Sequence, residues 1–451
     1  MLNGLFSYII DHLNKYKTEM HDIFKKTLNH EKLDVKLASL QALSNYLQTV
    51  EQVDTKKFQD LIDDMVNVIV CACKEDDETV LQDAWIEFNE IAEIEPKFFQ
   101  KKMKDIFATT KDIVLKDDFA NDKIQQQPIE FYVTCIERIP AIVKKNPALL
   151  TEIIQLIFRL MINVDADIEE SWLRPKEGFR DNNDDGDEDN VNFGKSSIDK
   201  LISAVGDELA LPILSGAVNE TIQNDSDWRY KNAALMAFSQ VGEYIDEIAK
   251  ISAMVPIVVT HLTHQNPRIR YAALHCIGQI SDDMTEDFQS EFGATVLPAL
   301  IQTLSDPVPR VSAHCSSAIT NFMDGAEEEL VAPQIEALLA KLLPLIKEGI
   351  SIQKENSVTA FASTAVAIKT QFDKYFNDSL DVLLNQLHVN SGPEYKQLRA
   401  QIIEGITLMA GSVSDEVFMA KSQQIIEAMV AIQTSNMDSK DPQRSYLLSA
   451  W

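Results

Sequence analysis

Carboxylate and amide side chains recur at fixed positions in the middle of the chain. One block is written three times between residues 228 and 324, as WRYKNAALMAFSQVGE, PRIRYAALHCIGQISD and PRVSAHCSSAITNFMD. Each block ends on a carboxylate and carries an amide three residues earlier: Gln240 and Glu243, Gln279 and Asp282, Asn321 and Asp324. Carboxylates bind ammonium groups through charge-assisted hydrogen bonds, and amides bond to peptide backbone. This pattern therefore predicts a surface for a lysine-rich segment.

A second interpretation stays open, because any exposed helix face carries Asp, Glu and Gln. Trp228 opens the first block and is a further candidate, since its ring could cover a lysine stem or pack under a turn. The matching positions of two later repeats hold Ala365, Ile368, Leu408 and Gly411. We therefore expect the row of amides and carboxylates, called the polar ladder below, to end before them.

The stretch 174–196 has no apolar period and contains a dense acidic core. Its acidic residues are Asp181, Asp184, Asp185, Asp187, Glu188 and Asp189. Like charges at this density repel and cannot be buried together, which predicts a solvated loop inside one repeat. Insertions in repeat proteins often lie on the binding face, which favours contact with a basic partner over a solvated loop without a role.

Catalytic motifs are missing from the sequence. It contains no HExxH, GxGxxG, GxxxxGK[ST] or GxSxG. His261 and His264 stand three residues apart, but no third ligand accompanies them, so capping or solvated histidines are favoured over a metal pair. We expect no enzyme activity, no catalytic residue, no metal and no cofactor.

The three blocks recur at steps of 39 and 42 residues without an internal gap, which predicts a helical-repeat array. We take Tyr230, Ile269 and Val311, which occupy the same position in the three blocks, as the anchors of the blocks. Small and apolar residues follow each anchor at intervals that define one face of a helix. Apolar stretches containing Pro256 and Pro298 come before the second and third blocks, and predict a kinked first helix. A kinked helix, a short turn and a straight helix form the HEAT pattern.

The same second-helix pattern recurs near residues 35, 80, 355 and 398 and extends the array. The expected fold is all-α: one α-solenoid of HEAT repeats over 1–451, with about ten helix pairs in a superhelical arch. The last residues, RSYLLSAW, begin another second helix. We therefore expect a chain that continues in a longer protein.

The formal net charge of −29 argues against binding to nucleic acid and favours basic partners. The five cysteines are an odd number and stand mostly among apolar residues, which indicates reduced thiols in the cytosol or nucleus. No apolar run reaches the length of a membrane span, so no membrane interaction is expected.

The three blocks and the terminal DPQRSYLLSAW resemble the importin-beta (karyopherin-beta) superfamily of nuclear transport receptors, most closely its karyopherin beta-three (importin five) class. The resemblance is specific at 227–324 and at the C-terminal end. Family members are longer, so it implies that repeats are missing from both ends.

The resemblance implies a receptor that binds basic localisation signals on an acidic concave surface and shuttles between cytoplasm and nucleus. Passage would use Phe-Gly nucleoporins, and Ran-GTP would release cargo, with its main site outside this chain. The family's cargo-binding surface would correspond to the amides and carboxylates of the three blocks. The acidic loop would contact Ran or cargo. The alternative is a HEAT scaffold of a multisubunit assembly such as a phosphatase.

Overall fold

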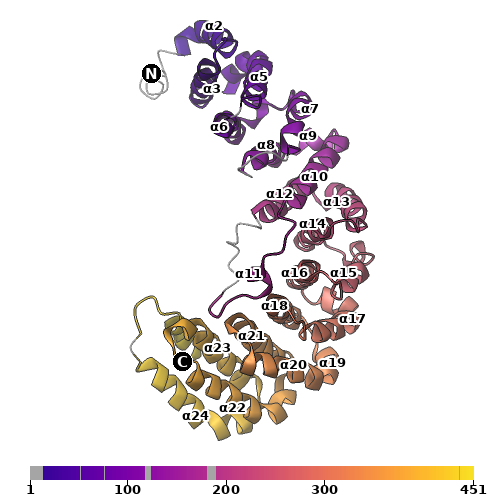
Figure 1. The fold of residues 1–451 in the computed structure, drawn as a ribbon, viewed down its shortest axis with the longest axis vertical. Coiled ribbons are helices and arrows are strands. Elements are labelled where there is room, and N and C mark those ends of the chain that lie inside the picture. Colours follow the sequence, from indigo (N-terminus) through magenta and orange to yellow (C-terminus); the bar gives the residue numbers. More distant parts are fainter. Residues whose placement is uncertain (1–13, 51, 76, 117–122, 180–188, 436) are drawn as a thin grey trace. The chain divides into compact units, whose positions relative to one another are not determined.

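The computed structural model describes residues 14–50, 52–75, 77–116, 123–179, 189–435 and 437–451. All regular secondary structure in these ranges is helical, which confirms the all-α prediction (Figure 1). None of the described helices is both long and apolar enough to cross a bilayer.

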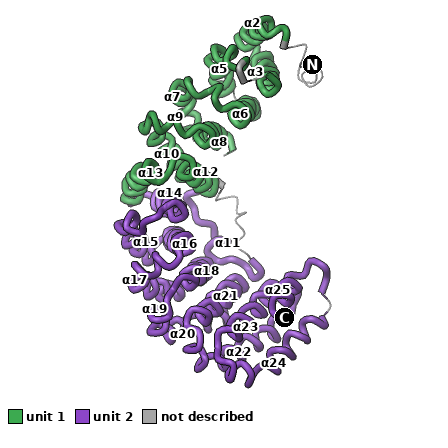
Figure 2. Tube along the Cα trace, turned by 180° about the vertical axis from the view of Figure 1, so that it is seen from behind, with its two compact units in different colours: residues 1–164, 186–224 green, residues 165–185, 225–451 purple. Residues whose placement is uncertain are grey.

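The chain divides into two compact units (Figure 2). Unit 1 comprises residues 1–164 and 186–224, and unit 2 comprises residues 165–185 and 225–451. The expectation of one continuous array stays a prediction, and each unit is described by itself.

Unit 1 has two layers of helices, each built from alternate long helices of the sequence. Its first-helix layer contains α2 (Lys17–Leu28), α5 (Ile62–Ala72), α7 (Met103–Val114), α10 (Pro147–Ile162) and α13 (Asp207–Ile222). Its second-helix layer contains α3 (Leu33–Leu47), α6 (Glu78–Ile94), α8 (Lys123–Arg138) and α12 (Asp189–Val205).

Unit 2 repeats this arrangement and holds the three sequence blocks. Its first-helix layer contains α15 (Val255–His261), α17 (Asp287–Thr303), α20 (Ile335–Glu348), α22 (Asp373–Val389) and α24 (Asp415–Gln433). Its second-helix layer contains α14 (Trp228–Phe238), α16 (Pro267–Asp283), α18 (Pro309–Asp324), α21 (Ser351–Ile368), α23 (Lys396–Ser412) and α25 (Gln443–Ala450). Successive members of each layer are in contact, as the HEAT pattern predicts.

Small residues bring the second helices close together. A Cβ placed on Gly278 of α16 would lie 3.3 Å from the Cα of Ala318 in α18, so the two backbones approach directly. Pro298 lies inside α17, which is where the predicted kink requires it. The prediction of a proline inside the helix is wrong for Pro256, which is the second residue of α15, where proline fits the first turn of a helix.

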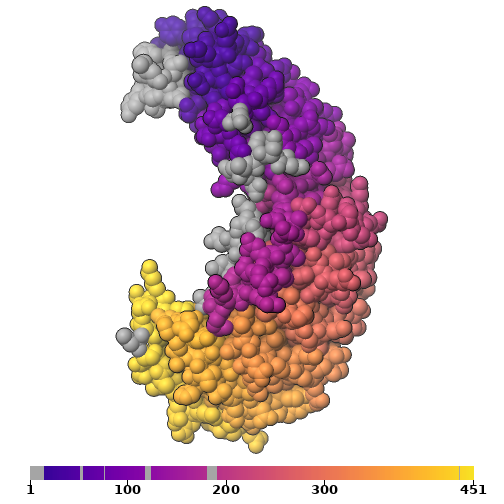
Figure 3. Space-filling model, viewed as in Figure 1, coloured from indigo at the N-terminus to yellow at the C-terminus, as the bar shows by residue number. Residues whose placement is uncertain are grey.

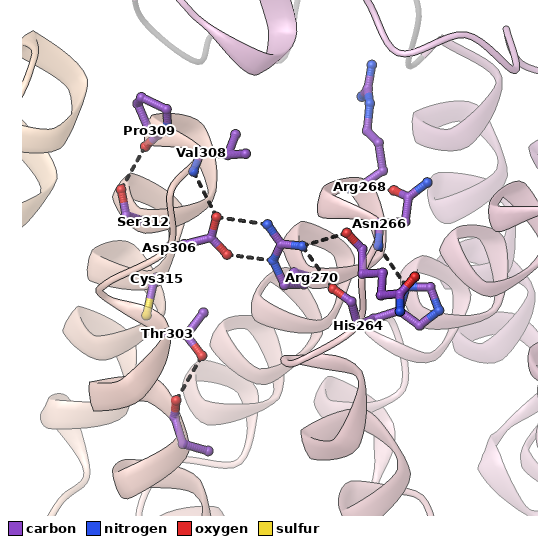
Figure 4. Close-up of polar contacts among 12 residues, drawn as sticks. His264, Asn266, Arg268, Arg270, Thr303, Asp306, Val308, Pro309, Ser312 and Cys315 are labelled. Atoms are coloured by element: carbon purple, nitrogen blue, oxygen red, sulfur yellow. Dashed lines mark hydrogen bonds and ion pairs between the residues drawn. The ribbon is translucent and has the colours of Figure 1, made fainter.

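A buried ion pair joins two repeats of unit 2 (Figure 4). Arg270 of α16 donates from Nε and Nη2 to the carboxylate of Asp306, at 2.5 and 2.9 Å. Its Nη1 donates to the backbone oxygens of His264 and Gln265. Asp306 also accepts the N–H of Val308, at 2.9 Å. One guanidinium therefore holds the turn before α16 and the turn before α18 together.

The loop expected over 174–196 ends earlier than predicted, because α12 already begins at Asp189. Asn190 is buried, accepts a hydrogen bond from Gln126 at 3.0 Å and donates one to the Asn163 oxygen at 2.9 Å. Val191 is buried as well. These contacts fix the first turn of α12 against α8 and the residue that follows α10.

Candidate functional site

Two of the predicted carboxylates line one hollow on unit 2. Asp282 lies in the last turn of α16 and Asp324 is the last residue of α18, and both are exposed. The hollow has a volume of about 860 Å³ and extends to α19 (Glu328–Val331), α21 and α23. We call it the acidic groove.

The acidic groove combines negative charge with apolar surface. Its charged lining consists of Asp282, Asp324, Glu327, Glu328, Glu329 and Lys369, which is five carboxylates against one ammonium group. Val366 and Leu408 also line it and are 44% and 40% exposed. A lysine side chain pairs an apolar stem with a charged tip, so it matches both parts of this lining.

Leu408, one of the residues at which the polar ladder is expected to end, is partly exposed and brings apolar surface. The structure adds that this apolar surface belongs to the same groove as Asp282 and Asp324. The end of the ladder is therefore part of the candidate site.

Glu243 does not lie on the second helix, contrary to the prediction. α14 ends at Phe238, and Glu243 is exposed in the short 3-10 turn η5 (Gly242–Tyr244). The Ser239 hydroxyl bonds back to the Met236 oxygen, and Gly242 is a poor helix former, so the helix stops short. Glu243 is not among the residues that line the acidic groove.

The three predicted amides are half-buried and already donate hydrogen bonds inside the chain. Gln240 donates to the Ser239 hydroxyl at 2.8 Å, Gln279 to Asp283 at 2.8 Å, and Asn321 to the Gly278 oxygen at 3.1 Å. Asn321 alone of the three lines the acidic groove. These bonds orient the amides and reduce what they can offer to a bound peptide.

Asp283 is a functional candidate that the sequence pattern missed. Burial raises its pKa to about 6, with a further contribution from the negative charges of Asp282 and Glu243, although the Gln279 N–H opposes the shift. A Cβ on Gly242 would lie 2.7 Å from the Cβ of Asp283, so the turn after α14 packs against this carboxyl. Negative charge therefore accumulates where α14 and α16 end.

Trp228 lies away from the acidic groove. It is half-buried at the start of α14, and its Nε1 donates to the Ala166 oxygen at 3.0 Å. It lines a separate hollow of about 420 Å³ together with Lys231 and His264. Of the predicted cargo residues, Asp282, Asn321 and Asp324 line the acidic groove and Trp228 lines the second hollow, whereas Gln240, Glu243 and Gln279 line neither.

Most of the acidic residues of the predicted loop fall outside the described residues. This holds for Asp181, Asp184, Asp185, Asp187 and Glu188. Asp189 is the first residue of α12. A role of these residues toward Ran or cargo stays a prediction.

Three further residues were missed as a group. Trp172 of α11 (Glu170–Leu173) lies against Arg268 of α16 and Arg310 of α18. The available signal was the arginine that stands one residue before the anchor of each block. Trp172 itself gave none, because its surroundings have no helical period.

Known protein families match most of the chain. A model described as "IPO5-like, TPR repeats" matches residues 1–109, one described as "Importin repeat" matches 117–212, and one described as "HEAT repeat" matches 254–284. Importin subunit beta-3 of Saccharomyces cerevisiae is 27% identical over 435 residues, which is 95% of this chain and 39% of that protein. The chain is therefore similar to proteins of the importin-beta family over almost its whole length.

Solved importin structures resemble the fold. Kap121p bound to the extreme C-terminus of the protein phosphatase Cdc14p superposes with a TM-score of 0.86 at 25% identity, over 95% of this chain and 41% of that one. Kap121p bound to Nup53p gives a TM-score of 0.89 at 24% identity, over 100% of this chain and 43% of that one. The chain spans about two fifths of the length of the relatives it matches.

Proposed function

We propose that this chain acts in nuclear import and that its acidic groove binds lysine-rich localisation signals of cargo. The observation that supports this most is the lining of the groove, where five carboxylates lie beside exposed Val366 and Leu408. Ammonium groups would pair with the carboxylates while the lysine stems cover the apolar residues. The complex of Kap121p with a C-terminal segment of another protein supports recognition of peptides by a relative.

The first test is a titration with a labelled lysine-rich peptide at low and at physiological salt. Binding through exposed charges weakens as salt rises, because mobile ions screen the attraction. We expect clear binding at low salt and a marked loss of affinity at high salt. Affinity that does not change with salt would contradict a charge-based groove.

The second test neutralises the groove. We expect the double variant Asp282→Asn with Asp324→Asn to bind the peptide about tenfold more weakly or worse, since each lost charge-assisted bond removes roughly 1 kcal/mol or more. The matched control is Asp415→Asn with Glu416→Gln, which removes the same charge from exposed positions of α24. An equal loss of peptide affinity in both variants would mean that the overall net charge, and not the groove, causes the effect. No loss in either would favour a HEAT scaffold for a multisubunit assembly.

We further propose transport through Phe-Gly nucleoporins, shuttling between cytoplasm and nucleus, and regulation by Ran-GTP. The complex of Kap121p with Nup53p supports the nucleoporin part. Family resemblance supports the Ran part. Pull-down with immobilised Phe-Gly repeats, and with Ran loaded with GTP or GDP, tests each part separately.

A further inference from the structure

Residues 165–179, called the strap below, lie across unit 2 next to its second-helix layer. Figure 3 shows this magenta stretch lying over the orange helices. Within the strap only Trp172 and Pro175 are buried, and the other residues are half or fully exposed. It is therefore held by few anchors, as a bound peptide is.

The main anchor is Trp172, which is 4% exposed. The Arg268 guanidinium lies 4.3 Å from the centre of its ring, and that of Arg310 lies 5.2 Å away. Arg310 also lies 4.5 Å from the ring of Phe179, and Tyr271 meets Trp172 edge-on at 5.7 Å. The two arginines and the tyrosine form a surface that recognises aromatic side chains.

A carboxylate provides the next anchor. Glu177 accepts hydrogen bonds from the backbone N–H of Ser351, at 3.2 Å, and from its hydroxyl group. Ser351 is the first residue of α21, where an N–H group has no partner within the helix. At the other end of the strap, the Ala166 oxygen accepts the Trp228 Nε1–H. The strap thus presents aromatic rings and a carboxylate in fixed order.

The charges on α16 and α18 oppose the helix dipole at both ends. Arg268 and Arg310 are the second residues of these helices, and Asp282 and Asp324 stand in their last turns. A helix is stabilised by negative charge at its start and positive charge at its end, so this placement does not serve helix stability. It produces one basic and one acidic strip on the same two helices.

We propose that the basic strip formed by Arg268, Tyr271, Arg310 and Ser351 is a second peptide-binding surface, for partner segments that are acidic and carry an aromatic residue. The strap occupies this surface within the chain and competes with the partner. The strip lies at the opposite helix ends from the acidic groove, so it binds independently of lysine-rich signals.

The probe for this proposal is a labelled synthetic peptide with the sequence of residues 165–179. The protein is the full chain, as wild type and as Trp172→Ala, which loosens the strap. We expect the peptide to bind the Trp172→Ala chain at least about tenfold more tightly than wild type, because the attached strap no longer competes at high effective concentration. Equal affinity for the two chains would overturn the proposal.

Controls separate recognition from charge. Leu173→Ala, one residue along the strap, should leave peptide affinity close to that of wild type. A peptide in which the tryptophan is replaced by alanine should not bind the Trp172→Ala chain. If it binds as well as the parent peptide, charge alone accounts for binding and the proposal fails.

Arg268→Lys with Arg310→Lys, placed in the Trp172→Ala chain, keeps both charges but removes the planar groups that stack on the ring. We expect peptide affinity to fall at least about tenfold while the far-ultraviolet circular dichroism and the binding of a lysine-rich peptide stay unchanged. Unchanged affinity for the strap peptide would overturn the assignment of the arginines. The lysine-rich probe keeps this test separate from that of the acidic groove.

Hydrogen exchange on the wild-type chain gives a measurement without substitution. Excess unlabelled strap peptide should accelerate exchange at the Trp172 amide, which the attached strap protects by its bond to the Glu169 oxygen. Exchange that stays unchanged at saturating peptide would show that the strap is not displaced, and would contradict competition.

Discussion

Asp283 shows how one partly buried carboxyl group makes stability depend on pH. Its pKa rises from 3.8 to about 6, mainly because the group is partly buried beside Asp282 and Glu243. The folded chain therefore holds the proton more tightly than the unfolded chain. The free energy of unfolding should fall as pH rises from 3.8 to about 6, and the contribution of the bound proton is lost above that range.

Asp283→Asn removes this charge and keeps an oxygen that can accept the Gln279 bond. At neutral pH we expect the free energy of unfolding of the variant to exceed that of wild type by about 1 kcal/mol. This value is reduced because Asp283 is partly exposed. The difference should vanish at about pH 4, where the wild-type group is protonated in the folded chain. Urea unfolding at both pH values checks this, and a constant difference across them would show that the charge is not the cause.

At the same scale, the sequence predicted some side chains well and others poorly. Asp282 and Asp324 are exposed as expected, because their distance along the helix from the packed residues fixes the direction in which they point. Trp85 is fully buried against Phe88 and Phe131, which the repeat register alone does not indicate. A large ring fills space between helices that a one-dimensional register does not describe.

At the scale of elements, the Arg270–Asp306 pair should be essential for the contact between α16 and α18. Both side chains are largely buried, at 12% and 4% exposed. Asp306→Ala leaves the guanidinium buried without its counter-charge, so we expect a loss of about 3 kcal/mol in the free energy of unfolding. Chemical denaturation followed by circular dichroism measures it.

The control is Asp381→Asn, which breaks the exposed pair between Lys421 of α24 and Asp381 of α22. Its cost should stay below about 1 kcal/mol, because water screens an exposed pair. Similar costs for the two variants would mean that burial does not decide the strength of these bridges.

Helix pairing could be predicted because apolar residues repeat at helical intervals, whereas two element boundaries could not. α14 stops at Phe238 because of local bonds in the following turn. α12 starts at Asp189 because Asn190 finds distant partners in Gln126 and Asn163. The strap was missed for a similar reason, since its order comes from Arg268 and Arg310, far away in sequence.

At the scale of the whole molecule, helices contact mainly their neighbours in the layers, and the chain forms two compact units. Arrays of this kind lose cooperativity over long distances, so parts of the chain unfold separately. We expect the calorimetric enthalpy of thermal unfolding to exceed the van't Hoff enthalpy. A single transition with equal enthalpies would show instead that both units unfold together.

The repeat length sets a step for any peptide that follows the acidic groove. Asp282 and Asp324 come from helices that touch in the layer, and packed helices lie roughly 8–10 Å apart. A peptide in the polyproline II conformation advances about 3.1 Å per residue and returns to the same side every three residues, so one turn covers about one helix spacing. Positive side chains three positions apart would then meet successive carboxylates, and a peptide with adjacent lysines would place only one of them on each helix.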